Sequence, residues 1–403
     1  MTKKRICFVC EYMLCGGVEK SLLSLLQALP PARFDITVLL LQKKGELLDQ
    51  IPDWVHVKEM ELPSSVADDL LIGKGNALKK AVRERHLLRA AKKAINGLLI
   101  SVPKCSGEMK RVRYYDRISL VIPDYPESFD VVIDYMGYGL FNTFYAAKKM
   151  HAEKKLSWIH FDVELSMGDI SAYTNYFSDF DRLVCVSQEI REKSERKLPQ
   201  FKEKFRVFHN VIQTERIWQL ANEGTGFTEN DPTPRIVSVG RLDPQKGFDL
   251  ALIAFNKLKK EGYLFHWYII GEGHQREELE KLVREYQLTD DVTLMGRQLN
   301  PYPYIAQCDL YFQPSRHEAY GIAAAEARVL CRPVLCTDFS GAREQFRDGE
   351  TARIVKCEVQ ELYTGLKEML DHPELRDRFR NLLEEEKPTV EGIADEFDQL
   401  ISD

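Results

Sequence analysis

Short apolar runs alternate with segments of helical periodicity along most of the chain. The first helical segment is expected at Val18–Leu29, directly after the first apolar run. Alternation of strands with helices of about 10–15 residues predicts βαβ units, in which a parallel sheet carries helices on both faces. Six apolar runs are expected as the strands of a first sheet: Ile6–Cys10, Asp35–Leu41, Asp130–Tyr135, Lys155–His160, Arg182–Ser187 and Phe205–Ile212.

The same alternation starts again at Arg235, after a stretch rich in glycine, proline and polar residues that is typical of a linker. The second set of strands is expected at Ile236–Val239, Phe265–Ile270, Val292–Met295, Leu310–Gln313, Pro333–Cys336 and Ala352–Val355. We therefore predict an α/β protein with two Rossmann-like, doubly wound domains that face each other across a cleft. The predicted boundaries are residues 1–213, a linker at 214–234, a second domain at 235–384, and a C-terminal helix in 385–403 that packs back on the first domain.

Length and composition narrow the class of protein. A chain of 403 residues suits two domains of about 150–200 residues. The net charge of −6 argues against a general nucleic-acid binder. The nine cysteines are scattered without a framework, which favours reduced thiols. Because no apolar stretch resembles a signal peptide or reaches the ~20 residues of a membrane span, we expect a cytoplasmic protein, either free or peripheral on the cytoplasmic face of the membrane.

Residues 74–117 depart from this pattern because they are strongly basic. They hold thirteen lysines and arginines against three acidic residues, in a chain whose overall charge is negative. Apolar residues such as Leu78, Val82 and Leu88 recur among them at roughly helical spacing. One interpretation is a basic amphipathic helix pair that binds anionic lipid or a phosphorylated acceptor. The other is a solvated helical face packed on the first domain.

Two glutamates flank the start of a predicted helix after the strand Leu310–Gln313. Glu318 lies in the loop before the helix, and Glu326 lies in its second turn. The backbone N–H groups at a helix start, here around Tyr320, Gly321 and Ile322, form an anion site that the helix dipole favours. Carboxylates accept strong hydrogen bonds from paired hydroxyls. This pattern predicts a site that holds a nucleotide sugar, with its diphosphate at the helix start.

A basic loop follows the strand Ile236–Val239. Its sequence runs Gly240-Arg-Leu-Asp-Pro-Gln-Lys-Gly247, so that Arg241 and Lys246 can reach a diphosphate from the end of the strand. There they would neutralise the charge that develops on a departing diphosphate. Ligands of open α/β sheets bind at the carboxyl ends of strands, so this loop and the Glu318–Glu326 element are expected to share one site.

In combination, these elements resemble family 4 retaining glycosyltransferases of GT-B fold, the group 1 glycosyl transferases, over roughly Arg235 to Val355. The resemblance implies that Arg241 and Lys246 bind the donor diphosphate, that Glu318 contacts the transferred sugar, and that Glu326 contacts the nucleotide ribose. It also implies that the loops at Gly271–Gly273 and Gly296–Arg297 border the base. The matching segments are Val239–Gly247, Ile270–Gly273, Leu294–Gly296, Glu318 with Glu326, Arg332–Val334 and Asp348-Gly349.

The N-terminal half agrees with this resemblance. Gly16 and Gly17 follow the first strand, as the glycine-rich loop of the family does, although an ordinary strand–helix turn is the other interpretation. His160 ends a strand beside Asp162 and resembles the family's active-site histidine, where the alternative is a structural core residue. We predict His160, Glu318, Arg241 and Lys246 as catalytic residues. The donor-binding residues are predicted to be Gly16, Gly17, Gly240, Gly271, Gly273, Arg297, Tyr320, Gly321, Ile322 and Glu326.

The predicted activity is transfer of a sugar, with retention of configuration, from a nucleoside diphosphate sugar to an acceptor hydroxyl. UDP is the nucleotide expected from the family, and a lipid-linked saccharide or a cell-envelope polysaccharide is the expected acceptor. Neither a cofactor nor a metal is expected, and Asp179-Phe-Asp181 is interpreted as a surface turn. The alternatives are a GT-B enzyme with a soluble small acceptor, and a non-catalytic subunit that binds a nucleotide sugar or a glycan.

Overall fold

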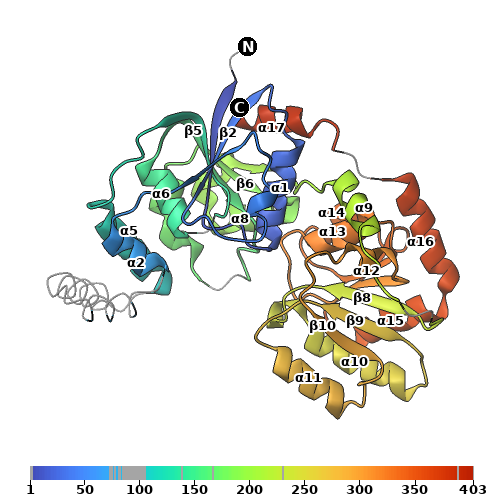
Figure 1. Cartoon of the computed structure of the whole chain (residues 1–403). Coiled ribbons are helices and arrows are strands. Elements are labelled where there is room, and N and C mark those ends of the chain that lie inside the picture. Colours follow the sequence, from blue (N-terminus) through green and yellow to red (C-terminus); the bar gives the residue numbers. More distant parts are fainter. Residues whose placement is uncertain are drawn as a thin grey trace. The chain divides into compact units, whose positions relative to one another are not determined.

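The computed structural model describes residues 3–71, 76, 79, 83, 106–137, 139–165, 168–228, 231–387 and 390–402. They form two compact units, each built on a parallel sheet of its own (Figure 1). The N-terminal unit comprises Met1–Cys185, Arg191–Val207 and Glu396–Asp403, and the C-terminal unit comprises Val186–Ile190 and Phe208–Asp395.

The N-terminal unit contains a seven-stranded sheet in the order β3-β2-β1-β4-β5-β6-β7, and every neighbouring pair is parallel. The order reverses between β1 and β4, which is the switch point where ligands of such sheets bind. Its strands are β1 (Lys4–Cys10), β2 (Phe34–Leu40), β3 (His56–Glu59), β4 (Ser128–Asp134), β5 (His151–Ile159), β6 (Arg182–Cys185) and β7 (Phe205–Val207). Its helices are α1 (Gly17–Ala28), α2 (Ser64–Leu71), α5 (Gly107–Ser119), α6 (Phe141–Lys149), α7 (Thr174–Phe177) and most of α8 (Gln188–Lys197).

The C-terminal end of the chain returns to the N-terminal unit. Helix α17 (Ile393–Ser402) places the Phe397 ring 6.2 Å from the ring of Phe8 and 5.8 Å from that of Phe34. Asp398 forms ion pairs with Lys4 at 2.6 Å and with Arg33 at 2.7 Å. The last turns of the chain therefore complete the core beside β1 and β2.

The C-terminal unit contains a six-stranded parallel sheet in the order β10-β9-β8-β11-β12-β13, with its switch point between β8 and β11. Its strands are β8 (Arg235–Val239), β9 (His266–Ile270), β10 (Val292–Gly296), β11 (Leu310–Gln313), β12 (Val334–Thr337) and β13 (Ala352–Val355). Its helices are α9 (Thr214–Asn222), α10 (Phe248–Lys260), α11 (Arg276–Glu285), α12 (Tyr302–Ala306), α13 (Ile322–Val329), α14 (Ala342–Gln345), α15 (Val359–Asp371) and α16 (Pro373–Glu385).

Successive strand residues of this sheet enter two separate cores, because side chains alternate between the faces of a strand. Ile236 and Phe312 pack in one core with helix α10, while their neighbours Val237 and Tyr311 pack in the other with helix α13. Both faces are thus covered, which accounts for the nearly continuous apolar runs in the sequence.

The region expected as a linker is partly helical. Helix α9 lies within residues 214–234, and its Ile217 and Ala221 are buried in a core of the C-terminal unit. The units change at Val207/Phe208 rather than at residue 213, because β7 ends at Val207. The glycines and prolines that indicated a linker lie after α9, whose Ile217 and Ala221 give the helix a buried face.

Candidate functional site

Two loops meet at the switch point of the C-terminal sheet. The loop after β8 carries a short 3₁₀ turn, Pro244–Lys246, and Gly247 follows it with φ +68°. A Cβ at Gly247 would lie 2.1 Å from the carbonyl oxygen of Pro314, in the loop after β11. Only a glycine allows this backbone approach, in a conformation that other residues adopt at a cost. The two loops can therefore lie this close because residue 247 is a glycine.

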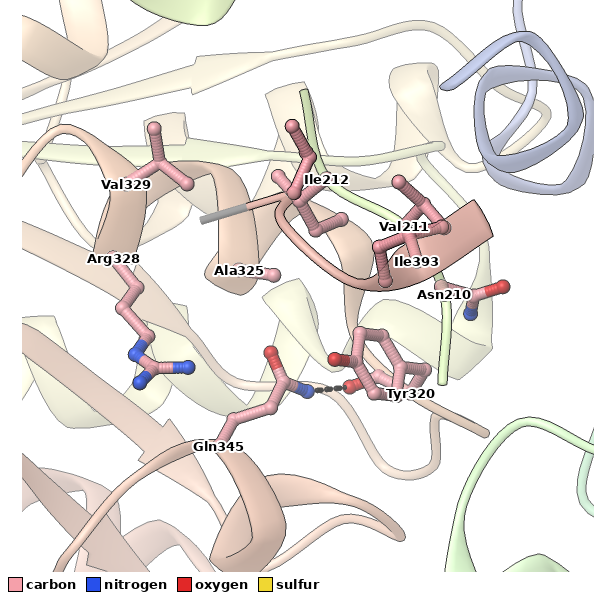
Figure 2. Close-up of a pocket in the computed structure, with 10 residues that line it drawn as sticks. Asn210, Val211, Ile212, Tyr320, Ala325, Arg328, Val329, Gln345 and Ile393 are labelled. Carbon is pink, nitrogen blue, oxygen red and sulfur yellow. Dashed lines mark hydrogen bonds between the residues drawn. The ribbon is translucent and has the colours of Figure 1, made fainter. Parts of the chain in front are cut away.

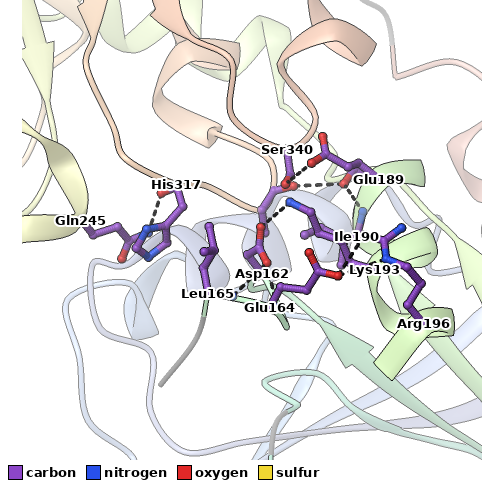
Figure 3. Close-up of polar contacts among 12 residues, drawn as sticks. Asp162, Glu164, Leu165, Glu189, Ile190, Lys193, Arg196, Gln245, His317 and Ser340 are labelled. Carbon is purple, nitrogen blue, oxygen red and sulfur yellow. Dashed lines mark hydrogen bonds and ion pairs between the residues drawn. The ribbon is translucent and has the colours of Figure 1, made fainter. Parts of the chain in front are cut away.

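Hydrogen bonds hold the two loops together. The Arg316 N–H donates to the Gln245 carbonyl at 2.7 Å. The Gln245 side-chain amide donates to the His317 carbonyl at 3.0 Å (Figure 3). The Arg316 guanidinium forms a bidentate pair with Asp249, both distances being 2.7 Å. Such pairs are geometrically specific, so the loop bearing Lys246 is fixed against the loop bearing Glu318.

Lys246 and Glu318 form an ion pair where these loops meet. Lys246 Nζ lies 2.5 Å from Glu318 Oε1, and the two side chains are only 15% and 11% exposed. The same oxygen accepts hydrogen bonds from Ser315 Oγ at 2.8 Å and from Gln313 Nε2 at 3.1 Å. Tyr311 OH in turn donates to Gln313 Oε1 at 2.8 Å. Among the described residues, no hydrogen bond engages Glu318 Oε2, so this oxygen is the one that can receive a ligand.

Glu326 is held separately on helix α13. It is buried, and its Oε1 accepts a hydrogen bond from Tyr302 OH of α12 at 2.7 Å. The helix begins after Gly321, whose φ of +84° turns the chain so that the backbone N–H groups of the first turn are presented at the helix start. Ile322 and Tyr320 beside it are half-buried. A helix start with two fixed carboxylates around it can bind an anion that carries hydroxyl groups.

The glycine loops predicted to border the ligand are tied to each other through the backbone. Gly240 N–H donates to the Ile270 carbonyl at 3.0 Å, and Gly271 N–H donates to the Gly296 carbonyl at 2.9 Å. Gly273 accepts a hydrogen bond from the Arg276 N–H at 3.2 Å. The carboxyl ends of β8, β9 and β10 thus form one continuous edge that leads to Lys246.

Arg241 and Arg297 differ from Lys246 because they lie at the surface. The Arg241 side chain is 75% exposed and contacts Asp243 at 3.3 Å. Arg297, directly after β10, is also exposed. Exposed cations of this kind can reorient toward a bound phosphate, whereas Lys246 is already fixed.

His160 lies at the end of β5 in the N-terminal unit. Its ring centroid is 4.7 Å from that of Tyr135, and burial lowers the pKa of the imidazole to about 3, although a hydrogen bond with the Tyr135 backbone acts in the opposite direction. His160 Nε2 is buried and has no hydrogen-bond partner among the described residues. A neutral imidazole with one unsatisfied nitrogen can form a hydrogen bond with a ligand but is not a cationic catalyst.

The neighbours of His160 have structural roles in this unit. Asp162 accepts a hydrogen bond from Lys193 at 2.6 Å and from the Glu164 and Leu165 N–H groups at 2.9 and 3.2 Å (Figure 3). The Lys193 and backbone hydrogen bonds lower the pKa of Asp162, despite the opposing effect of its burial. Gly16 and Gly17 lie at the start of α1, where Gly16 is the N-cap residue.

Sequence reasoning missed the residues that hold the two glutamates. Gln313 and Ser315 are buried polar residues on either side of Pro314, at the end of an apolar strand. A glutamine that ends a buried strand is a detectable signal, because burying an unpaired amide is costly. Tyr302 gave no such signal, since a tyrosine in an apolar helix is equally well explained by packing.

Most of the basic segment 74–117 lies outside the described residues. Its last part forms helix α5, on which Lys110, Arg111 and Arg117 are exposed. Over the described part of the chain, no helix combines the length and apolar character needed to cross a membrane.

Comparisons with known proteins give a family match on the C-terminal unit. Residues 225–385 match the family model described as glycosyl transferases group 1. The N-acetylgalactosamine-N,N'-diacetylbacillosaminyl-diphospho-undecaprenol 4-alpha-N-acetylgalactosaminyltransferase of Campylobacter jejuni is 35% identical over 180 residues, which are 44% of this chain and 47% of that protein. Alpha-D-kanosaminyltransferase of Streptomyces kanamyceticus is 32% identical over 151 residues, which are 37% of this chain and 39% of that protein. The aligned region thus spans less than half the length of these two relatives.

The fold is shared over the whole chain with a solved structure. The crystal structure of Anabaena HepE in complex with UDP and glucose matches 99% of both chains with a TM-score of 0.67, at 14% sequence identity. The family match falls on the unit that contains Lys246, Glu318 and Glu326. Residues 225–385 therefore belong to the glycosyl transferases group 1 family, and the chain has the GT-B fold.

Proposed function

We propose that this protein is a retaining glycosyltransferase that moves a sugar from a UDP-sugar to a hydroxyl of a lipid-linked saccharide or cell-envelope polysaccharide. The observation that carries this proposal is the fixed Lys246–Glu318 pair at the switch point of the C-terminal sheet. The pair places a cation that can bind phosphate beside a carboxylate that can accept hydrogen bonds from sugar hydroxyls, and both side chains are largely buried. UDP is chosen because HepE, which shares the fold, was crystallised with UDP and glucose.

In this proposal the donor binds along the carboxyl edge of the C-terminal sheet. Lys246, Arg241 and the N–H groups at the start of α13 bind the diphosphate, while Glu326 accepts hydrogen bonds from the ribose. Glu318 Oε2 accepts hydrogen bonds from the transferred sugar, since its Oε1 is already occupied. The loops at Gly271–Gly273 and Gly296–Arg297 border the base. Donors fixed before the reaction stabilise the charge that develops on the leaving diphosphate.

The proposed chemistry is substitution on one face of the sugar. The bond between the anomeric carbon and the diphosphate oxygen breaks, and the acceptor hydroxyl attacks from the side that the diphosphate leaves. The departing phosphate oxygen takes the hydroxyl proton, which gives a glycoside of unchanged configuration and UDP. His160 is neutral because of its burial, so it orients a sugar hydroxyl rather than donating positive charge.

A lipid-linked acceptor is favoured by the relative from Campylobacter jejuni, whose name contains a diphospho-undecaprenol acceptor. The basic segment 74–117 would then face an anionic membrane surface from the cytoplasmic side, because clusters of lysine and arginine bind anionic lipid. The second candidate is a GT-B enzyme with a soluble small acceptor. It is supported by the 2-deoxystreptamine glucosyltransferase of Streptomyces kanamyceticus, which is 30% identical over 167 residues and whose name contains a small aminocyclitol.

A transfer assay tests the proposal. Purified protein is incubated with UDP-, GDP- and ADP-sugars and with either an undecaprenyl diphosphate saccharide or a soluble aminocyclitol, and the product's anomeric configuration is read by NMR. We expect UDP release that depends on the lipid-linked acceptor and a product with the donor's configuration. Turnover only with the soluble acceptor would support the second candidate. Binding without turnover, with function intact in Glu318→Gln, would indicate a non-catalytic subunit.

A further inference from the structure

A small pocket lies behind helix α13 in the C-terminal unit. Its volume is about 150 Å³, and Figure 2 shows the residues that line it. A cavity needs a volume of roughly 10–15 Å³ to hold one water molecule. The volume of this pocket is about ten times larger. Pockets for drug-sized ligands measure about 300–1,000 Å³, so it is too small for a nucleotide sugar. Its size fits a small metabolite.

Four of the residues that line the pocket carry polar side chains, namely Gln345, Arg328, Tyr320 and Asn210. Gln345 is 5% exposed and donates through Nε2 to the carbonyl oxygens of Tyr320 and Gly341, while its buried Oε1 has no partner among the described residues. In Figure 2, Gln345 lies between the Arg328 side chain and Tyr320. The Arg328 guanidinium is a cation at one side of the pocket. Burial raises the pKa of Tyr320 to about 12, so its hydroxyl stays protonated.

The remaining wall is apolar and comes from different parts of the chain. Ala325 and Val329 lie on α13, Val211 and Ile212 precede α9, and Ile393 begins α17. An unsatisfied buried amide oxygen is costly, so Gln345 Oε1 favours an occupant that offers an O–H or N–H donor. A guanidinium at the other side favours a carboxylate or phosphate.

We propose that this pocket binds a small hydroxylated anion, whose hydroxyl donates to Gln345 Oε1 and whose charged group pairs with Arg328. The ligand would also touch the ring of Tyr320, whose backbone neighbours start helix α13. The pocket is separate from Lys246 and Glu318, neither of which lines it. Tyr320, which is also predicted to bind the donor, does line it, so the test below includes a variant of the donor site.

The test is calorimetric titration of the full-length protein with glycerate, glycerol 3-phosphate, glycerol and propionate. Glycerate and glycerol 3-phosphate carry both a hydroxyl and an anion, and they separate a carboxylate ligand from a phosphate ligand. Glycerol lacks the charge and propionate lacks the hydroxyl. We expect saturable binding of at least one hydroxylated anion, with affinity at least tenfold above that for glycerol and propionate.

Three variants test whether the ligand binds in this pocket. Ala325→Leu fills the pocket from α13 without removing a polar group, and Arg328→Gln removes the cation, so both should lose at least tenfold in affinity. Lys246→Ala, which alters the proposed donor site alone, should bind as the wild type does. Absence of saturable binding by any probe, unchanged affinity in Ala325→Leu, or loss of affinity in Lys246→Ala would overturn the proposal. Thermal unfolding of each variant checks that it folds.

Discussion

Lys246 and Glu318 are 72 positions apart in the chain, yet Lys246 Nζ lies 2.5 Å from Glu318 Oε1. The contact depends on two loops that Gly247 and Pro314 bring within backbone distance. Both side chains are largely shielded from solvent, so the pair differs from exposed ion pairs, which contribute about 0–1 kcal/mol. A bound diphosphate would compete with Glu318 for Lys246.

Removal of either partner should destabilise the protein before any ligand is considered. Breaking a buried pair costs up to about 3–5 kcal/mol, and some solvent access reduces this to roughly 2 kcal/mol for Lys246→Met or Glu318→Gln. The free energy of unfolding of the double variant should fall by at least 1 kcal/mol less than the sum of the two single losses. The reason is that neither Lys246 nor Glu318 is then left without its partner. Urea unfolding of the four proteins measures this coupling. Strictly additive losses would show that the pair contributes nothing to the folded state.

Ser315→Ala should impair turnover without weakening nucleotide binding. It removes one of the three donors to Glu318 Oε1, so the carboxylate is less well fixed toward the sugar. We expect kcat to fall about tenfold, in line with a hydrogen bond to a charged group worth about 1.5 kcal/mol, while the Kd for UDP changes less than twofold. Ser238→Ala is the matched control, because Ser238 is also buried but bonds to Phe312 and Trp267. Equal kinetic effects in both variants would argue against a positioning role for Ser315.

Tyr302→Phe should weaken binding of UDP through Glu326. Loss of the phenol leaves the buried Glu326 carboxylate without this donor, which costs about 1–3 kcal/mol of stability. A less fixed carboxylate should raise the Kd for UDP several-fold. Tyr304→Phe on the same helix provides the control, since no hydrogen bond of its hydroxyl contributes to the site. Calorimetry would contradict the assignment if both variants bound UDP as tightly as the wild type.

Gly247→Ala tests whether the approach of the two loops is required. The added Cβ would meet the Pro314 carbonyl, so the loops must separate and Lys246 must move. Gly262 also has a positive φ, of +85°, but no atom lies within 4 Å of its Cβ position. Gly262→Ala should therefore cost only backbone strain of about 1 kcal/mol, whereas Gly247→Ala should cost more and lower UDP affinity at least tenfold. Similar affinities in the two variants would exclude the loop contact as a determinant.

His160 should make stability depend on pH below neutrality. Its folded pKa of about 3 is below the ordinary value of 6.5, so the unfolded chain binds more protons between these values. The contribution of His160 to the stability of the fold is thus present above pH 6.5 and is lost as the pH falls toward 3. Burial raises the pKa of Asp134 to about 6, which gives the opposite slope between about pH 4 and 6.

Comparison with His160→Gln isolates the histidine from Asp134. Urea unfolding at pH 5 and pH 7.5 should show that the wild type loses more stability on acidification than the variant does. If the variant loses as much stability as the wild type on acidification, or more, His160 does not make the expected contribution to the pH dependence.

The sequence pattern predicted the buried strands and the two-sheet organisation well, because both faces of each sheet are covered and the strands are continuous apolar runs. It missed β3, His56–Glu59, an edge strand in which Val57 is the one apolar residue and all four residues are half-buried or exposed. It also included α9 in the linker, although the glycines and prolines lie after this helix and its Ile217 and Ala221 are buried. Contacts such as Tyr302 with Glu326 depend on how α12 packs on α13, and no local signal in the sequence specifies that.

Calorimetric binding of UDP, GDP, ADP and their sugars to the wild type, Lys246→Ala and Glu326→Ala tests the donor site most directly. We predict selective binding of UDP and a UDP-sugar to the wild type, with at least a tenfold loss in each folded variant. Absence of nucleotide binding to the folded wild type, or wild-type affinity in both variants, would contradict the assignment of the switch-point loops as the donor site.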